Sequence, residues 1–176
     1  MRTYIVLPLV MVCVAPAWAQ NPFDQVKQAA GEVKKAAGPE VTKEVEKQVN
    51  AKLTTEARKN QCSFKSDSDV LAPGCDAKLK KLADALVDAK SKLTQAGVAA
   101  YKFEVSGHTD SRGKADHNKE LSGKRAAVIA KELVSRGVAP GEIISVGMGS
   151  ERMLVTPDNT PAKKAKNRRY EIQVRI

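Results

Sequence analysis

Residues 105–125 constrain the fold of this chain most, because a strand ends there, turns sharply and becomes a helix. Apolar and polar side chains alternate over residues 101–106, which is the period-2 pattern of a half-buried strand. Gly107 and the stretch 111–113 interrupt this alternation, and a helical pattern follows. The chain therefore presents the carboxyl end of a strand next to the start of a helix, where polar side chains of both elements meet.

One face of that helix is polar, and one acid precedes it. Asn118, Leu121 and Arg125 recur at i, i+3 and i+7, so they lie on one side of the helix, while Asp110 follows the strand. An acid and a guanidinium facing one mouth can hold the two charges of a zwitterion. The alternative is a structural salt bridge between Asp110 and Arg125, a common arrangement of surface charges.

The remaining pattern predicts a mixed α/β domain. A helix follows Asp76 and ends at Gly97, a strand covers residues 144–148, and residues 170–176 alternate strictly. A short strand is predicted at 63–64, and residues 153–166 show no sustained period. The order strand, helix, strand, helix, strand, strand predicts a two-layer α/β sandwich whose mixed sheet is covered by helices on one face.

Several spaced motifs resemble the OmpA-like C-terminal domain family, the peptidoglycan-binding module. The signature begins with Gly107-His108-Thr109-Asp110 and continues through Asn118 to Leu121-Ser122-x-x-Arg125-Ala126. Further matches in the same order are Gly147-Met148-Gly149, Asp158-Asn159-Thr160 and Asn167-Arg168-Arg169. The resemblance covers residues 60–176, and such an ordered set is more specific than any single motif.

The resemblance implies a βαβαββ sandwich that binds the peptidoglycan stem peptide without covalent chemistry. It implies that Asp110 and Arg125 together bind the side-chain end of diaminopimelate, an ammonium and a carboxylate on one carbon. Thr109, Asn118 and Leu121 would line the rim of the site. Arg168 and Arg169 are further candidates, although an arginine at a strand edge is as often structural.

The first 19 residues have the pattern of a secretory signal peptide. An apolar run from Tyr4 to Val14 is too short to span a bilayer, and Ala17-Trp18-Ala19 suits signal peptidase. Val12 precedes Cys13 where a lipidation site requires a small residue, so we expect no lipid anchor. We therefore expect a periplasmic protein, a free-standing member of the family without a membrane barrel, held at the peptidoglycan and associated with the outer membrane through what it binds.

Cys62 and Cys75 are the cysteines that remain after removal of residues 1–19. In an oxidising compartment a disulfide between them is the leading interpretation, and two buried free thiols are the alternative. Two cysteines without C-x-x-C spacing do not make a zinc site, and we predict no metal.

Residues 20–59 differ from the rest of the chain in lacking strand-like alternation. They predict two helices, interrupted at Gly38-Pro39, with a thin apolar stripe that includes Val45, Val49 and Leu53. A solvated spacer or a helix packed on its own domain is favoured over a coiled-coil dimer. We therefore predict three parts: a signal peptide (1–19), a helical spacer or interaction segment (20–59) and the binding domain (60–176).

Composition narrows the class of function. The net charge of +10 favours anionic surroundings without choosing among them. A nucleic-acid site at Lys163, Lys164, Lys166, Arg168 and Arg169 would rest on charge alone, without interleaved aromatics, and the export signal argues against it. No nucleophile with a paired base and no phosphate-binding loop is present, so we predict a binding protein that is not an enzyme and has no cofactor. The alternative is an envelope adaptor that recruits a partner through residues 20–59.

Overall fold

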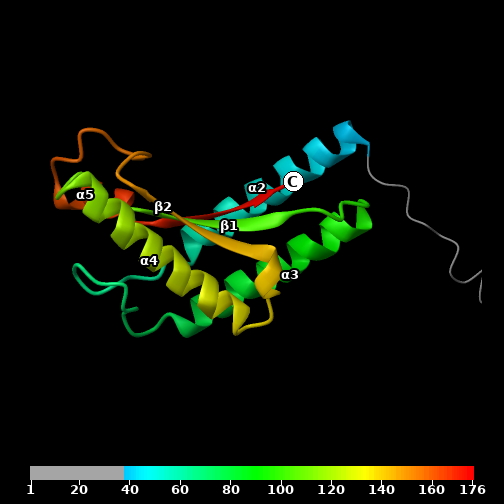
Figure 1. Ribbon diagram of the computed structural model, residues 1–176, viewed down its shortest axis with the longest axis horizontal. Helices are drawn as coiled ribbons and strands as arrows, with labels where there is room; N and C mark the ends of the chain where they lie inside the picture. The colour runs from blue at the N-terminus through cyan, green and yellow to red at the C-terminus, as the bar shows by residue number, and fades with distance from the viewer. Residues whose placement is uncertain (1–37) are drawn as a thin grey trace, which may run out of the picture. The chain divides into compact units, whose positions relative to one another are not determined.

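The computed structural model of the protein describes residues 38–176. The predicted signal peptide and residues 20–37 lie outside the described residues. The elements, in chain order, are α2 (Pro39–Lys59), α3 (Asp76–Gln95), β1 (Lys102–His108), α4 (Ala115–Val134), the 3-10 helix η2 (Pro140–Glu142), β2 (Ile143–Gly149), α5 (Pro161–Asn167) and β3 (Tyr170–Arg175). Figure 1 shows the strands crossing the middle of this unit between the helices. None of the helices in residues 38–176 is both long and apolar enough to cross a membrane.

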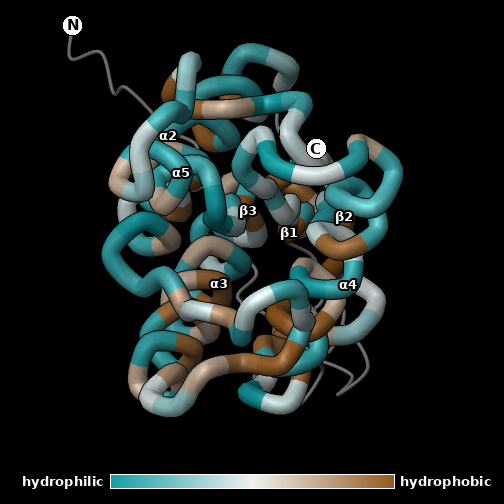
Figure 2. Tube along the Cα trace, turned by 90° about the vertical axis from the view of Figure 1, so that its left-hand side faces the viewer, coloured by the Kyte–Doolittle hydropathy of each residue, from teal (hydrophilic) through white to brown (hydrophobic). Residues whose placement is uncertain are grey.

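The sheet is mixed and has the strand order β2-β1-β3. β1 runs parallel to β2, with Phe103 opposite Ile143, and antiparallel to β3, with Phe103 opposite Val174. The parallel connection is made by α4, as parallel strands need a crossover. Figure 2 shows α3 and α4 together on one side of the three strands. The predicted α/β sandwich, a mixed sheet with helices on one face, is confirmed.

The core lies between this sheet face and the two helices. Most of the largest fully buried side chains come from α3, β1, α4 and β3 and have exposed fractions below 2%. They include Leu79, Leu82, Leu86, Leu93, Phe103, Val105, Ile129, Leu133, Ile172 and Val174. The apolar stripes that predicted these elements therefore face one another, which is the main favourable term in their folding.

α2 belongs to this core, so the predicted domain boundary at residue 60 does not match the structure. Val49, Leu53 and Ala57 are 1–2% exposed and join the same cluster of buried side chains. Of the alternatives weighed for this segment, the structure has a helix packed on its own domain. The apolar stripe of α2 looks thin in the sequence because only its carboxyl-terminal half packs against α3 and β3. Val41, at the amino-terminal end, is 51% exposed.

Two amide side chains, Asn50 in the middle of α2 and Gln61 just after its end, form hydrogen bonds with the outer edge of β3. Asn50 Nδ2 donates to the carbonyl of Val174 at 3.2 Å, and the Val174 N–H donates to Asn50 Oδ1 at 2.7 Å. Gln61 makes the same two-way contact with Tyr170, at 2.8 and 3.1 Å. These two amides take the place of a neighbouring strand, which satisfies backbone groups that an edge leaves open.

The strand predicted at residues 63–64 is reduced to a single bridge between Phe64 and Leu71. The loop instead closes on itself, with the Lys65 N–H donating to Val70 O and the Ala72 N–H to Ser63 O, both at 2.9 Å. Asn50 and Gln61 already form hydrogen bonds with the backbone groups at the outer edge of β3, so a fourth strand cannot pair there.

The predicted disulfide is not formed in the structure. Cys62 and Cys75 are free and buried, and Cys62 Sγ lies 3.9 Å from the carbonyl oxygen of Cys75. Burial, together with the adjacent Cys75 thiol, raises the pKa of Cys62 to about 12. The alternative of two buried thiols is therefore the one the structure has, and both pack as small apolar side chains in the core.

The stretch predicted to be irregular, 153–166, contains the start of α5. Pro161 occupies the first helical turn, and the Lys163 N–H donates to Thr160 Oγ1 at 3.3 Å. A Thr-Pro pair is a helix-start signal, which a search for long apolar periods misses because the helix has only 7 residues.

Candidate functional site

Two glycines bring α4 directly against the carboxyl ends of β1 and β2. A side chain at Gly107 would collide with the carbonyl oxygen of Ser122, and one at Gly147 with that of Lys119. Helix and strands can approach this closely only because glycine has no Cβ. The close approach sets the amino-terminal half of α4, which carries Asn118, Leu121 and Arg125, beside the turn that follows β1.

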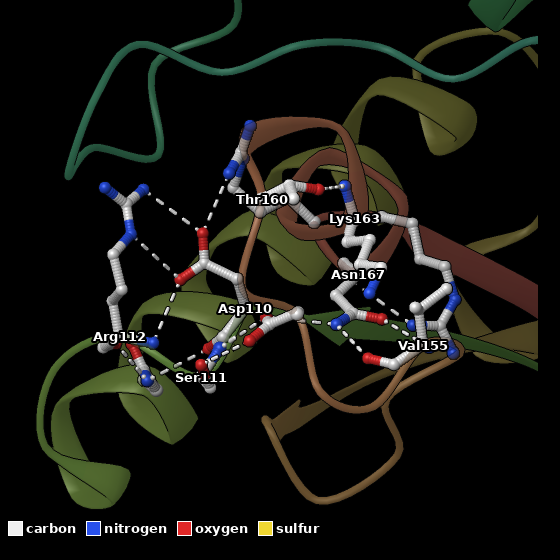
Figure 3. Close-up of polar contacts among 11 residues, drawn as sticks. Asp110, Ser111, Arg112, Val155, Thr160, Lys163 and Asn167 are labelled. Carbon is white, nitrogen blue, oxygen red and sulfur yellow. Dashed lines mark hydrogen bonds and ion pairs between the residues drawn. The ribbon is translucent and has the colours of Figure 1, made fainter.

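Asp110 lies in that turn and is buried between two arginines. Arg112 contacts the carboxylate through its N–H at 3.1 Å and its guanidinium at 3.2 Å, and Arg168 Nη1 lies 2.8 Å from Oδ2. Figure 3 shows the carboxylate of Asp110 facing Arg112. Burial alone would raise the pKa of Asp110, but the hydrogen bonds from Arg112 and Arg168 outweigh it and lower that pKa. Asp110 is therefore held as a carboxylate.

The turn around Asp110 is braced from two sides. Asn118 Nδ2 donates to the carbonyl of Arg112 at 2.7 Å and lies 3.5 Å from that of Asp110. Asp158 accepts hydrogen bonds from the N–H and hydroxyl of Ser111, at 3.0 and 2.5 Å, and from Asn167 Nδ2 at 3.1 Å. Figure 3 shows this chain from Ser111 to Asn167. The Ser111 contacts lower the pKa of Asp158 to about 2. The acid at 110 is thus presented by a fixed backbone.

Arg125 does not pair with Asp110. Its Nε donates to the carbonyl of Ser68 at 2.8 Å and its Nη2 to that of Lys65 at 3.3 Å. The guanidinium also lies 5.1 Å from the centre of the Phe64 ring, within cation–π range. Burial lowers its pKa from the ordinary value. The structural salt bridge considered for these two residues is therefore not present: each has other partners.

Asp110 and Arg125 nevertheless line the same cleft, of about 1110 Å³. The other predicted residues, Thr109, Asn118, Leu121, Arg168 and Arg169, line it too. Arg168 contacts Asp110, whereas Arg169 pairs with Glu171 at 2.7 Å and donates to the carbonyl of Arg152. Arg168 thus contacts the acid of the cleft, whereas Arg169 contacts Glu171 and backbone carbonyls.

Among residues 38–176, two buried polar atoms on the cleft wall find no hydrogen-bond partner: His108 Nδ1 and Thr109 Oγ1. Unpaired buried polar atoms are uncommon and costly, and they cluster at sites where a ligand or water completes the pairing. Burial lowers the pKa of His108 to about 4, and the nearby Arg169 acts in the same direction. His108 is therefore neutral at pH 7, and the hydroxyl of Thr109, next to Asp110, is buried without a partner.

Sequence reasoning missed several lining residues. Arg112 follows Asp110 by two positions in a turn, a spacing that could have suggested the contact. Phe64 and Lys65 come from the 63–67 loop, and Thr54, Ala57 and Arg58 from α2. No local pattern marks these, because their approach to the cleft depends on how α2 packs.

The cleft is basic. It is lined by seven Lys and Arg residues (Arg58, Lys65, Arg112, Arg125, Lys166, Arg168, Arg169) and three acids (Asp67, Asp110, Glu171). Such an excess favours a ligand with more negative than positive groups. Within residues 38–176 no group of three or more His, Cys, Asp or Glu side chains could hold a metal ion.

The fold and the cleft define a mixed α/β binding domain in which a strand end and the following helix carry an acid and a guanidinium. The chain belongs to the OmpA family, whose model matches residues 63–168, and the resemblance inferred from the motifs is confirmed. The prediction that the protein is not an enzyme agrees with this family.

Relatives and solved structures extend the comparison. Outer membrane porin F of Pseudomonas fluorescens is 39% identical over 111 residues, which cover 63% of this chain and 31% of the relative. Peptidoglycan-binding protein ArfA of Mycobacterium bovis is 42% identical over 73 residues, 42% of this chain and 22% of that protein. The crystal structure of the peptidoglycan-associated lipoprotein of Burkholderia pseudomallei matches with a TM-score of 0.51 at 26% identity, covering 64% of this chain and 86% of the other. The chain thus spans less than a third of the first two relatives.

Proposed function

We propose that this protein binds peptidoglycan non-covalently in the cell envelope, through the diaminopimelate of the stem peptide. The observation that carries the proposal is that Asp110 and Arg125 line one cleft without pairing with each other. The names of ArfA and the lipoprotein relative support the ligand class. In this proposal the chain acts in the periplasm, after removal of residues 1–19, as an anchor for the envelope.

Asp110 would bind the ammonium of the ligand. Its present partner Arg112 has a side chain that is 66% exposed, and Arg168 one that is 41% exposed, so either guanidinium can move into solvent when the ammonium arrives. The exchange does not leave the buried carboxylate unpaired, because the incoming ammonium replaces the departing guanidinium as its counter-charge. The carboxylate itself stays buried and oriented by the braced turn.

Arg125 would bind the carboxylate on the same carbon. The carbonyls of Ser68 and Lys65 occupy only part of its N–H donors and fix the plane of the guanidinium. A planar guanidinium that is held in place loses little conformational freedom when it grips a carboxylate.

Binding to purified peptidoglycan sacculi tests the proposal. Asp110→Asn and Arg125→Gln should each weaken capture about 10- to 100-fold, since a hydrogen bond to a charged group contributes about 1.5–3 kcal/mol. Asp88→Asn and Arg175→Gln are matched controls, because both change exposed, ion-paired side chains outside the cleft. Diaminopimelate should compete, and Nα-acetyl-lysine, whose amine and carboxylate do not share a carbon, should not. Wild-type capture by the cleft variants, or equal competition, would refute this assignment.

The alternative, an adaptor that recruits a protein through residues 20–59, loses part of its proposed surface. Val49 and Leu53, which belong to the apolar stripe that would meet a partner, are buried in the domain itself. We therefore favour the binding of peptidoglycan over recruitment through this segment.

A further inference from the structure

α2 supplies a wall of the cleft although it precedes the residues matched by the family model, 63–168. Thr54, Ala57, Arg58 and Gln61 follow one another at helical spacing and all line the cleft. The wall is firmly attached, because Ala57 is buried and Gln61 is hydrogen-bonded in both directions to Tyr170. Arg58 is therefore carried at a set position on the cleft's edge.

The cleft is larger than one end of diaminopimelate requires. Its volume of about 1110 Å³ is slightly above the range for sites that take drug-sized ligands, about 300–1,000 Å³. A ligand that fills it must extend beyond the carbon held at Asp110 and Arg125. In a stem peptide the neighbouring group is a glutamate joined through its side-chain carboxyl, which leaves its α-carboxylate free.

The basic side chains of the cleft divide into engaged and available ones. Arg112 and Arg168 contact Asp110, and Arg169 contacts Glu171. Within the part of the chain that the structure describes, the side chains of Arg58, Lys65 and Lys166 have neither an ion pair nor a hydrogen bond, and Arg58 carries the one guanidinium among these three. Its neighbour Lys59 pairs with Glu56 at 3.6 Å and does not line the cleft. A positive charge at the carboxyl end of a helix interacts favourably with the helix dipole, and this applies to Arg58 and Lys59 alike. The dipole therefore does not account for the difference between the two residues, of which Arg58 lines the cleft.

We propose that Arg58 is a second carboxylate-binding residue of the cleft, which recognises the free α-carboxylate of the glutamate next to diaminopimelate. This inference rests on the proposed function. A guanidinium grips a carboxylate through two parallel N–H donors, and amidation of the glutamate replaces that acceptor pair with a neutral group carrying one oxygen. The α2 wall thus selects stem peptides by the charge of this carboxylate, while Asp110 and Arg125 hold the diaminopimelate end.

The test is calorimetric titration of the full chain with two soluble tripeptides, alanyl-γ-glutamyl-diaminopimelate and the same peptide with the glutamate α-carboxylate amidated. Wild type should bind the acidic peptide roughly 10-fold more tightly than the amidated one. Arg58→Gln should bind both peptides as wild type binds the amidated one. Lys59→Gln, a matched change in the same helical turn, and Lys166→Gln, at another basic lining residue, should keep the preference.

The outcomes separate the two proposals. If wild type binds neither peptide, or Asp110→Asn binds both as wild type does, the proposed function itself fails and the role of Arg58 with it. If wild type binds both peptides equally tightly, the proposed function stands and the role of Arg58 is refuted. A preference that survives in Arg58→Gln, or that disappears in Lys166→Gln instead, also overturns the assignment to Arg58.

Discussion

At the scale of single residues, two neighbouring ionisable side chains of the site, His108 and Asp110, have different charge states because their surroundings differ. His108 has a side chain that is 1% exposed and lies next to Arg169 and Glu171, yet its ring stays neutral, because burial and Arg169 disfavour the proton. Asp110, two residues later, stays ionised, because two arginines contact it. The lowered pKa of His108 predicts how the free energy of unfolding depends on pH.

His108 should make the fold less stable as pH falls from 6.5 to about 4. The folded-state pKa, about 4, lies below the ordinary value of 6.5, so in this window the unfolded chain binds a proton that the folded chain does not. Stability is then lost as pH falls, by an amount on the order of 3 kcal/mol across the window, and it does not change above it. Urea unfolding at a series of pH values measures this dependence.

His108→Asn should flatten that dependence, whereas His117→Gln, at an exposed histidine that contacts Asp67, should keep it. Equal slopes for wild type and His108→Asn would mean that His108 does not carry the effect.

Asn50 should stabilise the fold through the edge of β3. In Asn50→Ala both the N–H and the carbonyl of Val174 lose their partner, and an unpaired buried polar group costs about 1–3 kcal/mol. Thermal or urea unfolding should show this loss. Gln48→Ala, at an exposed amide on the same helix that only contacts Glu44, is the control and should change stability by less than about 0.5 kcal/mol. A cost for Asn50→Ala no larger than the control's would contradict the role of the edge contact.

At the scale of elements, a strong apolar period predicted the long helices and strands correctly. It did not predict short elements, or elements whose formation depends on a distant part of the chain. The helix from Asp76, the strand around Phe103 and the last strand were predictable because each has regularly spaced apolar side chains that are buried in the core. α5 is too short for a period, and the strand at 63–64 depends on whether the edge of β3 is open, which α2 decides. Interactions between distant segments carry no local signal.

The contact between α4 and β2 gives a prediction at this scale. Gly147→Ala adds a Cβ that collides with the backbone of Lys119 and Gly123, and overpacking of this kind costs about 1–3 kcal/mol. Since α4 also carries Asn118 and Arg125, its displacement should weaken capture by sacculi as well as stability. Gly141→Ala is the control, because a Cβ there meets no atom within 4 Å. Unchanged stability and capture in Gly147→Ala would show that the helix can shift without effect on the site.

At the scale of the whole molecule, the sequence predicted which residues gather at the cleft but not how they pair. Asp110, Thr109, Asn118, Leu121 and Arg125 share one cleft, as their positions at a strand end and on one helix face require. Their contacts with Arg112, Arg168 and the 65–68 carbonyls depend on loop conformation, which sequence spacing does not specify. The packing of α2 could not be predicted either. Its sequence indicates an apolar face but does not indicate that this face packs on α3 and β3.

The packing of α2 predicts that a chain beginning at Asn60 will not fold cooperatively. Such a chain keeps every motif of the family but loses Val49, Leu53 and Ala57 from the core and Asn50 from the edge of β3. Truncating one buried leucine to alanine alone costs about 2–5 kcal/mol, and the total stability of a domain is about 5–15 kcal/mol, so the combined loss is comparable to the whole. A chain beginning at Gly38, which retains α2, should unfold in one transition in urea and bind sacculi. Cooperative unfolding and undiminished capture by the chain from Asn60 would instead restore the domain boundary at residue 60 and make the packing of α2 dispensable.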